Sequence, residues 1–319
     1  MRRMGKRNPE TEKERQKREG KRNKTEMKTE MKKEMEEKMP ENRKEVRKAD
    51  GRPALLAVSF GTSYEETRKR TIEAIERDLV QAFPERNFYR AWTSERIRKK
   101  LRETRGLFYD NVKEAMERML GDGVTDVLIQ PTHMMPGVEY EAVKEVACAY
   151  AGQFETVRLG APLLEKEADL QRLAKAVEEI FAWVGEGEML ALMGHGSPIN
   201  RFPIYEKLEA IWEADGFARF CVGTVEYEPG FGAVLRRVRE RKPRKVYLAP
   251  LLVVAGDHAV NNMAGEDPDS WRSVLEKEGF ETECILQGMG EYSRIRELYV
   301  SHAQEAGKLS GARCSGDDE

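Results

Sequence analysis

The sequence predicts an α/β protein with two similar lobes, each built on a parallel four-stranded sheet. Three observations lead to this fold class. From Pro53 onward, short apolar runs alternate with amphipathic segments, a pattern typical of β-α units whose sheets are buried on both faces. The same strand-and-glycine pattern occurs twice along the chain. The first fifty residues contain almost no aliphatic or aromatic side chains, so the folded body is expected to begin near Pro53.

The expected strands are short apolar runs bounded by turn residues. They lie at 54–60, 87–92, 125–131, 155–159, 188–193, 219–225, 245–250 and 282–287. The first helix is placed over 63–83, because Ser63 and Glu66 have the spacing of a capping box. The other helices are expected at 94–104, 110–120, 138–150, 167–184, 202–215, 230–241, 270–278 and 291–306.

An internal repeat divides the body into its two lobes. VLIQP at 127–131 is followed by Gly137, and VYLAP at 246–250 is followed by Gly256 at the same spacing. We therefore expect a first lobe over 53–185 and a second over 186–306. The helix at 291–306 is expected to pack back across the lobe boundary.

The two ends of the chain are expected to lie outside these lobes. Residues 1–52 form a charged tail, disordered or helical, and 307–319 a disordered C-terminus. Methionines recur every four residues between Met27 and Met39, a spacing that would place them along one side of a helix. A solvated, fraying helix or coil and a partner or membrane-surface helix both stay open for this tail.

The charge distribution excludes some classes of function. The chain carries 55 Lys+Arg and 57 Asp+Glu. Residues 1–50 hold 19 basic and 12 acidic side chains, so the rest of the chain has a net charge of −9. An acidic body argues against nucleic-acid binding. No apolar stretch is long enough for a membrane span, and no secretory signal is visible, so we expect a cytoplasmic protein.

The four cysteines are scattered along the chain. Cys148, Cys221, Cys284 and Cys314 form no C-x-x-C pair and have no histidine at zinc-finger spacing. This argues against a structural zinc site and against a disulfide framework. We expect free thiols.

Histidines and a glutamate follow several predicted strands. His195, Glu226 and His258 come after the strands at 188–193, 219–225 and 245–250, and His133 follows the strand at 125–131. Ligands of open parallel sheets bind beyond the carboxyl ends of the strands. Two imidazoles and a carboxylate suit a divalent metal such as Co, Ni, Fe or Zn, although a strand-end histidine can instead cap a helix. His302, inside the last helix, is expected at the surface.

Other motifs are weaker. No P-loop is present, and Gly288–Gly290 lacks the third glycine of a dinucleotide fingerprint. Ser197 follows MGHG, but the G-x-S-x-G elbow of serine hydrolases is missing.

Taken together, the motifs resemble a known family. LLAVSFGTS at 55–63, RAWTS at 90–94, His133 with GVEY at 137–140, MGHG at 193–196, GTVE at 223–226 and GDHAVNNM at 256–263 occur in this order. The chain is similar to the anaerobic-type sirohydrochlorin cobaltochelatases, which are class II chelatases, and more distantly to ferrochelatases. The resemblance covers about 53–306 and implies Rossmann-like lobes with a cleft between them.

The resemblance also implies roles for individual residues. His195 and His258 correspond to the family's metal-binding and catalytic histidines, and Glu226 to its acidic partner, with Glu228 as the alternative position for that carboxylate. His133 corresponds to a histidine that faces the cleft. Substrate binding is assigned to His133 and to three residues of the first lobe, Arg90, Ser59 and Gly61. Arg90 and the basic cluster at 96–105 are candidates for binding substrate carboxylates.

The implied activity is that of a lyase of anaerobic cobalamin biosynthesis. It inserts Co²⁺ into sirohydrochlorin, or its precursor precorrin-2, with loss of two protons. No cofactor beyond the substrate Co²⁺ is expected, and the partners are sirohydrochlorin and divalent cobalt. Insertion of Fe²⁺ or Ni²⁺, and a tetrapyrrole or metal carrier without turnover, stay open as alternatives. A homo-oligomer also stays open.

Overall fold

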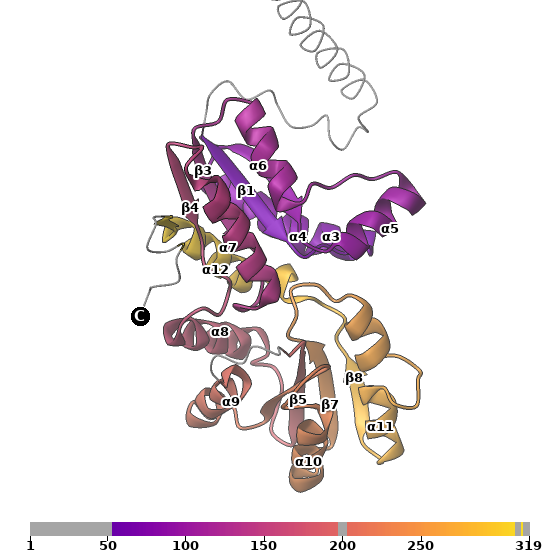
Figure 1. The fold of residues 1–319 in the computed structure, drawn as a ribbon. Coiled ribbons are helices and arrows are strands. Elements are labelled where there is room, and N and C mark those ends of the chain that lie inside the picture. The colour runs from indigo at the N-terminus through magenta and orange to yellow at the C-terminus, as the bar shows by residue number, and fades with distance from the viewer. Residues whose placement is uncertain (1–52, 197–202, 310–313, 315–319) are drawn as a thin grey trace, which may run out of the picture. The chain divides into compact units, whose positions relative to one another are not determined.

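The computed structural model describes residues 53–196, 203–309 and Cys314. These residues belong to one compact unit, and they form two α/β lobes (Figure 1). The expected tail at 1–52, Ser197 and most of the segment after 309 lie outside the described residues. No helix of the described part of the chain is long and apolar enough to cross a membrane.

The sheet of the first lobe has the strand order β2-β1-β3-β4-β9. Its parallel strands are β1 (Ala54–Ser59), β2 (Asn87–Trp92), β3 (Asp126–Pro131) and β4 (Thr156–Leu159). The short β9 (Gly307–Lys308) pairs antiparallel with β4. Alternate β1 residues face opposite sides, and all six are buried, as expected for a central strand covered on both faces.

The second lobe repeats this plan with the order β6-β5-β7-β8. Its strands β5 (Glu188–Gly194), β6 (Phe220–Thr224), β7 (Lys245–Pro250) and β8 (Glu281–Cys284) are all parallel. The predicted α/β class, the two parallel-sheet lobes and the eight predicted strands are confirmed. The first sheet differs from the predicted four strands by the additional antiparallel β9.

Helices cover both faces of each sheet (Figure 1). In the first lobe they are α3 (Glu65–Arg70), α4 (Ile72–Ala82), α5 (Glu95–Arg105), α6 (Val112–Gly121) and α7 (Val138–Ala151). The helices that follow the first sheet along the chain are α8 (Glu167–Ile180), α9 (Ile204–Ala214), α10 (Phe231–Arg241), α11 (Trp271–Lys277) and α12 (Ser293–Gln304). Two short elements, the π-helix η1 (His258–Met263) and the 3₁₀ turn η2 (Met289–Glu291), were not predicted.

The helix expected over 63–83 is divided at Thr71. This residue leaves helical geometry at φ −111° and ψ −82°, and its hydroxyl donates a hydrogen bond to the Thr67 carbonyl at 2.6 Å. A threonine hydroxyl that bonds back to the preceding turn competes with the helical ladder and bends the helix. Two helices, α3 and α4, result.

The last helix of each half packs on the other lobe. α8 follows the first sheet but packs against α9 of the second lobe, where the Trp212 indole donates to the Ala174 carbonyl at 3.3 Å. α12 follows the second sheet but packs against α4 and β3, where the Tyr299 hydroxyl donates to the Thr132 carbonyl at 3.0 Å. One hydrophobic cluster therefore runs from Leu55 in β1 through both helices to Leu192 in β5. The expected return of the last helix is confirmed, and α8 crosses in the opposite direction.

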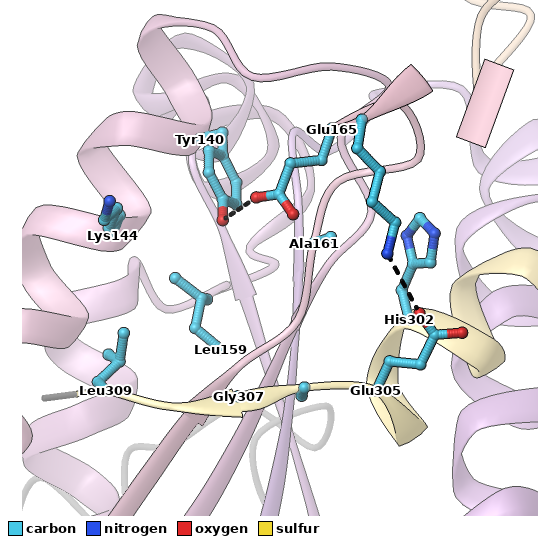
Figure 2. A pocket seen from close by; sticks show the side chains of 11 residues that line it. Tyr140, Lys144, Leu159, Ala161, Glu165, His302, Glu305, Gly307 and Leu309 are labelled. Atoms are coloured by element: carbon cyan, nitrogen blue, oxygen red, sulfur yellow. Dashed lines mark hydrogen bonds and ion pairs between the residues drawn. The ribbon is translucent and has the colours of Figure 1, made fainter. Parts of the chain in front are cut away.

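His302 on α12 is buried, so the prediction of a surface histidine is wrong. Only 2% of this residue is exposed, and Nε2 lies 3.3 Å from Oδ1 of the equally buried Asp169 on α8. The burial follows from the position of α12 between the lobes. His302 also lines a small polar pocket beside β9, shown in Figure 2, together with Tyr140, Lys144 and Glu165.

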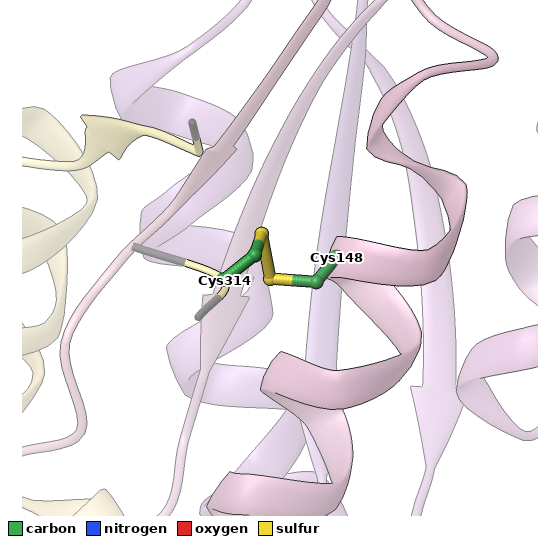
Figure 3. Close-up of a disulfide and its surroundings, with 2 residues drawn as sticks. All are labelled: Cys148 and Cys314. Carbon is green, nitrogen blue, oxygen red and sulfur yellow. A yellow bond between two sulfur atoms is a disulfide. The ribbon is translucent and has the colours of Figure 1, made fainter. Parts of the chain in front are cut away.

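The C-terminus also differs from the prediction. The expected disorder from 307 onward is wrong for residues 307–309, because β9 completes the edge of the first sheet and Leu309 is buried in its core. The expectation of free thiols fails for two cysteines, since Cys148 on α7 and Cys314 form a disulfide (Figure 3). Cys221 and Cys284 are free. A pairing across 166 residues depends on tertiary contacts that cysteine spacing does not reveal.

Candidate metal centre

The structure brings His195, Glu226 and His258 together. One ligand atom from each lies within 4.8 Å of the other two. The two imidazole rings meet edge to face, with centroids 5.2 Å apart and an interplanar angle of 83°. His195 and Glu226 are exposed and His258 is half-buried, so an ion can reach all three from solvent.

Two glycines allow His195 to occupy the end of β5. A Cβ at Gly194 would fall 2.7 Å from the Tyr205 ring. A Cβ at Gly196 would fall 1.7 Å from the Glu226 carbonyl oxygen, and Gly196 has a φ of +89° that favours glycine. The Glu226 backbone can therefore approach His195 closely, and its N–H donates to the His195 carbonyl at 2.9 Å.

A tight turn after β6 presents Glu226. The Thr224 hydroxyl lies 2.7 Å from the Glu226 carbonyl and 2.6 Å from the Tyr227 carbonyl, and Tyr227 has a φ of 66°. Glu228, the alternative site carboxylate, accepts a hydrogen bond from the Gly230 N–H at 2.9 Å, at the start of α10. Glu226, and not Glu228, is the carboxylate that lies with the two histidines.

Hydrogen bonds at Nδ1 orient both imidazoles. The Nδ1 atom of His195 lies 3.1 Å from the Gly196 carbonyl, and that of His258 lies 2.9 Å from the Asn262 side-chain oxygen. Because both partners are acceptors, we assign the ring proton to Nδ1 in each histidine. The Nε2 lone pairs then stay free to bind a metal, the arrangement that second-shell acceptors produce in metal sites.

Two polar residues beside this cluster were not predicted. The Asp257 carboxylate accepts from the Asn261 amide at 2.9 Å and from the Tyr64 hydroxyl of the first lobe at 3.4 Å. Burial and the nearby Asp257 raise the pKa of Tyr64, so this hydroxyl stays protonated and can donate. Asp257 belongs to the 256–263 motif noted in the sequence, but only the fold shows that Tyr64 contacts Asp257.

His133 is not part of the cluster of metal-ligating groups. Both of its ring nitrogens are inaccessible to solvent and have no hydrogen-bond partner among the residues that the structure describes. Burial lowers the pKa of His133 to about 4, so the ring is neutral at pH 7. The loop that holds it is pinned by the Leu163 N–H, which donates to the His133 carbonyl at 3.0 Å.

The three other predicted substrate residues lie in the first lobe, away from solvent or bound to neighbours. Arg90 lies two residues before the end of β2 rather than at a strand end, and its Nε donates to the buried Glu76 at 2.7 Å. Ser59 is buried and accepts from the Thr132 hydroxyl at 2.9 Å. Gly61 has a φ of +95°, and a Cβ there would clash with the Trp92 ring at 2.6 Å. Ser59 and Gly61 are buried, whereas the Arg90 side chain is 30% exposed and paired with Glu76.

The basic cluster on α5 borders a pocket that includes Tyr64. Lys100 and Arg105 line this pocket together with α3. The Lys100 Nζ donates to the Ser63 hydroxyl at 3.3 Å, and Arg105 lies 3.4 Å from Glu65. Both cations are on the surface, and they lie close to the loop that contacts Asp257.

Comparisons with known proteins agree with this fold. Residues 53–308 match the family model of the cobalt chelatase CbiK. A sirohydrochlorin cobaltochelatase of Salmonella typhimurium is 37% identical over 256 residues, which are 80% of this chain and 96% of the relative. Sirohydrochlorin cobaltochelatase CbiKC of Nitratidesulfovibrio vulgaris is 30% identical over 259 residues, covering 80% of this chain and 90% of the relative.

A solved structure supports the architecture. SirB from Bacillus subtilis, with Fe³⁺, aligns with a TM-score of 0.55 at 11% identity, over 80% of this chain and 95% of SirB. The two parallel-sheet lobes and these matches define the protein as a class II chelatase. Within that class, the chain belongs to the cobalt chelatase (CbiK) family.

Proposed function

We propose that this chain catalyses the insertion of Co²⁺ into sirohydrochlorin with release of two protons. The observation that carries the proposal is the group of two imidazoles and one carboxylate within 4.8 Å, in a chain of the cobalt chelatase family. This donor set is chemically suited to Co²⁺, Fe²⁺ and Ni²⁺, so the ligand types alone do not identify the metal. Cobalt is favoured over the other two ions by the names of the curated relatives.

The cluster suits a metal that must be bound and then released. The Nε2 atoms of His195 and His258 and one oxygen of Glu226 supply three ligands, which leaves positions on Co²⁺ for pyrrole nitrogens of the substrate. Because two of the three side chains are exposed, a macrocycle can approach the ion directly. Three ligands with open positions are typical of sites where a metal reacts rather than of closed structural sites.

Metal transfer and proton loss are linked in this arrangement. Two pyrrole N–H protons must leave as the nitrogens bind Co²⁺. When the ion passes from an imidazole to the macrocycle, the Nε2 lone pair that held it is free to act as a general base. His195 and His258 can each accept a pyrrole proton in this way, and the exposed Glu226 passes protons to solvent.

Binding at the edge of the macrocycle is assigned to cations of the first lobe. Sirohydrochlorin carries carboxylates around its rim, and Lys100 and Arg105 lie beside Tyr64, which itself contacts Asp257 next to His258. Arg90, Ser59, Gly61 and His133 stay predictions as substrate-binding residues. Sirohydrochlorin and precorrin-2 present similar carboxylates, so precorrin-2 stays an alternative substrate.

The cytoplasm is our proposal for the place where the protein acts. The Cys148–Cys314 disulfide is the observation against it, because disulfides are rare in cytosolic proteins. Cell fractionation with rapid thiol alkylation tests both points. Recovery in the cytosolic fraction supports the proposal, and recovery only in an extracytoplasmic fraction with both cysteines oxidised contradicts it.

The activity is tested by anaerobic incubation of the full chain with sirohydrochlorin and Co²⁺, Fe²⁺ or Ni²⁺, followed by absorbance. We expect catalytic turnover with cobalt, and loss of at least about 100-fold in rate for His195→Ala, His258→Ala and Glu226→Gln, since each removes a ligand. Glu228→Gln is the matched control, because its carboxylate lies in the same turn but outside the cluster. A stoichiometric spectral change without turnover, or near-normal rates in both histidine variants, would contradict the proposal.

A further inference from the structure

The two sheets end in the same way, residue for residue. In the second lobe Met193 of β5 pairs with Gly223 of β6 and with Pro250 of β7. In the first lobe Val58 of β1 pairs with Ala91 and with Pro131. Met193 and Val58 are therefore equivalent positions, and the residues that follow them can be matched one by one. Two positions after Met193 is His195, and two positions after Val58 is Phe60.

The backbone beyond the strands confirms this correspondence. The Glu226 N–H donates to the His195 carbonyl at 2.9 Å, and the Ser94 N–H donates to the Phe60 carbonyl at 3.2 Å. The next residue in each lobe is a glycine of positive φ, +89° for Gly196 and +95° for Gly61. Phe60 thus holds the place of His195 in the first lobe, and Ser94 holds the place of Glu226.

The first lobe does not have the chemistry of a metal centre at these two places. A phenyl ring cannot bind a cation through a lone pair. The Ser94 side chain is the N-cap of α5, where it accepts from the Ile97 N–H at 3.4 Å. What the first lobe offers at this position is an exposed aromatic side chain, since 49% of Phe60 is accessible to solvent.

Phe60 belongs to the loop that reaches the metal centre. Tyr64, four residues further on, donates a hydrogen bond to Asp257, the neighbour of His258. Tyr227, on the turn that presents Glu226, is a second exposed aromatic residue at 52%. Both side chains leave about half of their surface in water. The faces of a tetrapyrrole are flat and apolar, so contact between Phe60 and the macrocycle would remove apolar surface of both partners from water.

We propose that Phe60 is a substrate-positioning residue that packs against a face of the tetrapyrrole while His195, Glu226 and His258 hold the metal. This inference rests on the proposed function. The second lobe holds the metal ion. In the first lobe Phe60, at the position equivalent to His195, makes an apolar contact that orients the macrocycle. Removing the aromatic ring should weaken binding of the macrocycle roughly tenfold, the scale of one buried aromatic contact.

The test separates macrocycle binding from metal binding. Fluorescence quenching measures the Kd for metal-free sirohydrochlorin, calorimetry measures the Kd for Co²⁺ alone, and initial rates give KM and kcat. For Phe60→Ala we expect a roughly tenfold higher Kd for the macrocycle and a higher KM, with Co²⁺ affinity unchanged. Phe60→Tyr keeps the ring and is expected to stay within about twofold of wild type.

The matched control is Trp183→Ala. Trp183 is exposed to a similar extent, 53%, but precedes β5 and therefore lies near the opposite end of the second sheet. Wild-type macrocycle affinity in Phe60→Ala, or an equal loss in Trp183→Ala, would overturn the inference. If wild-type protein binds no macrocycle and inserts no cobalt, the proposed function itself fails. Metallation by wild type together with unchanged Phe60→Ala rejects this inference alone.

Discussion

Replacing Gly196 by alanine is expected to damage the metal centre although all three ligand side chains are kept. The new Cβ would lie 1.7 Å from the Glu226 carbonyl oxygen, and contacts of this kind need at least about 3 Å. The turn that carries Glu226 must therefore move by more than about 1 Å. Misplacement of a reacting group by 1 Å can cost roughly 100-fold in rate, so a loss of about this size in cobalt insertion is expected.

A second glycine separates backbone strain from the displacement of Glu226. Gly216 has a φ of +85°, close to the +89° of Gly196, but no atom lies within 4 Å of a Cβ placed there. Left-handed backbone geometry should cost each alanine variant about 1–2 kcal/mol of unfolding free energy, and the clash with Glu226 should add to this loss in Gly196→Ala alone. Only Gly196→Ala should lose affinity for Co²⁺.

The measurements are urea unfolding for stability, calorimetry for Co²⁺ affinity and anaerobic absorbance for insertion. The reasoning would be refuted if Gly196→Ala bound Co²⁺ and turned over as well as Gly216→Ala. It would equally be refuted if both variants lost metal affinity to the same extent, since strain alone would then account for the effect.

Two further predictions concern the first lobe. Burial holds the pKa of His133 at about 4 in the folded protein against about 6.5 when unfolded. The unfolded chain therefore binds the extra proton between these values, and stability should fall by about 3 kcal/mol as pH drops from 6.5 to 4. His133→Leu should flatten this part of a urea-unfolding pH profile, and an unchanged profile would contradict the assignment. Arg90→Met should lower the free energy of unfolding by about 3–5 kcal/mol, because it leaves the buried Glu76 carboxylate without its cationic partner. The double variant with Glu76→Met should recover most of that loss, and a KM for sirohydrochlorin that stays high in this stable double variant would assign Arg90 to substrate binding instead.

Much of the fold could be predicted because its signals are local. Strands buried on both faces read as continuous apolar runs, and every predicted run became a strand. The metal cluster could be predicted from the same logic, since the carboxyl ends of β5, β6 and β7 meet at one edge of a sheet. His195, Glu226 and His258 each follow one of these strands.

The failures arise where distant segments meet. Nothing in the sequence around His302 shows that α12 packs against α8, where Asp169 contacts His302. The ion pair between Arg90 and Glu76 on α4 likewise joins two segments whose contact the sequence does not reveal. The pairing of Cys148 with Cys314 depends likewise on the return of the chain to the first lobe. Local patterns carry no information about such contacts until the topology is known.

Because α8 and α12 each pack on the lobe other than the one whose sheet they follow, the chain faces a constraint when it folds during synthesis. The first sheet emerges early from the ribosome, but Ile295 and Tyr299, which cover one of its faces, belong to the last helix. The first lobe therefore stays partly uncovered until nearly the whole chain has been made. The two halves should fold as a single cooperative unit. A break after residue 185 would leave each fragment with an exposed apolar sheet face and a tendency to aggregate.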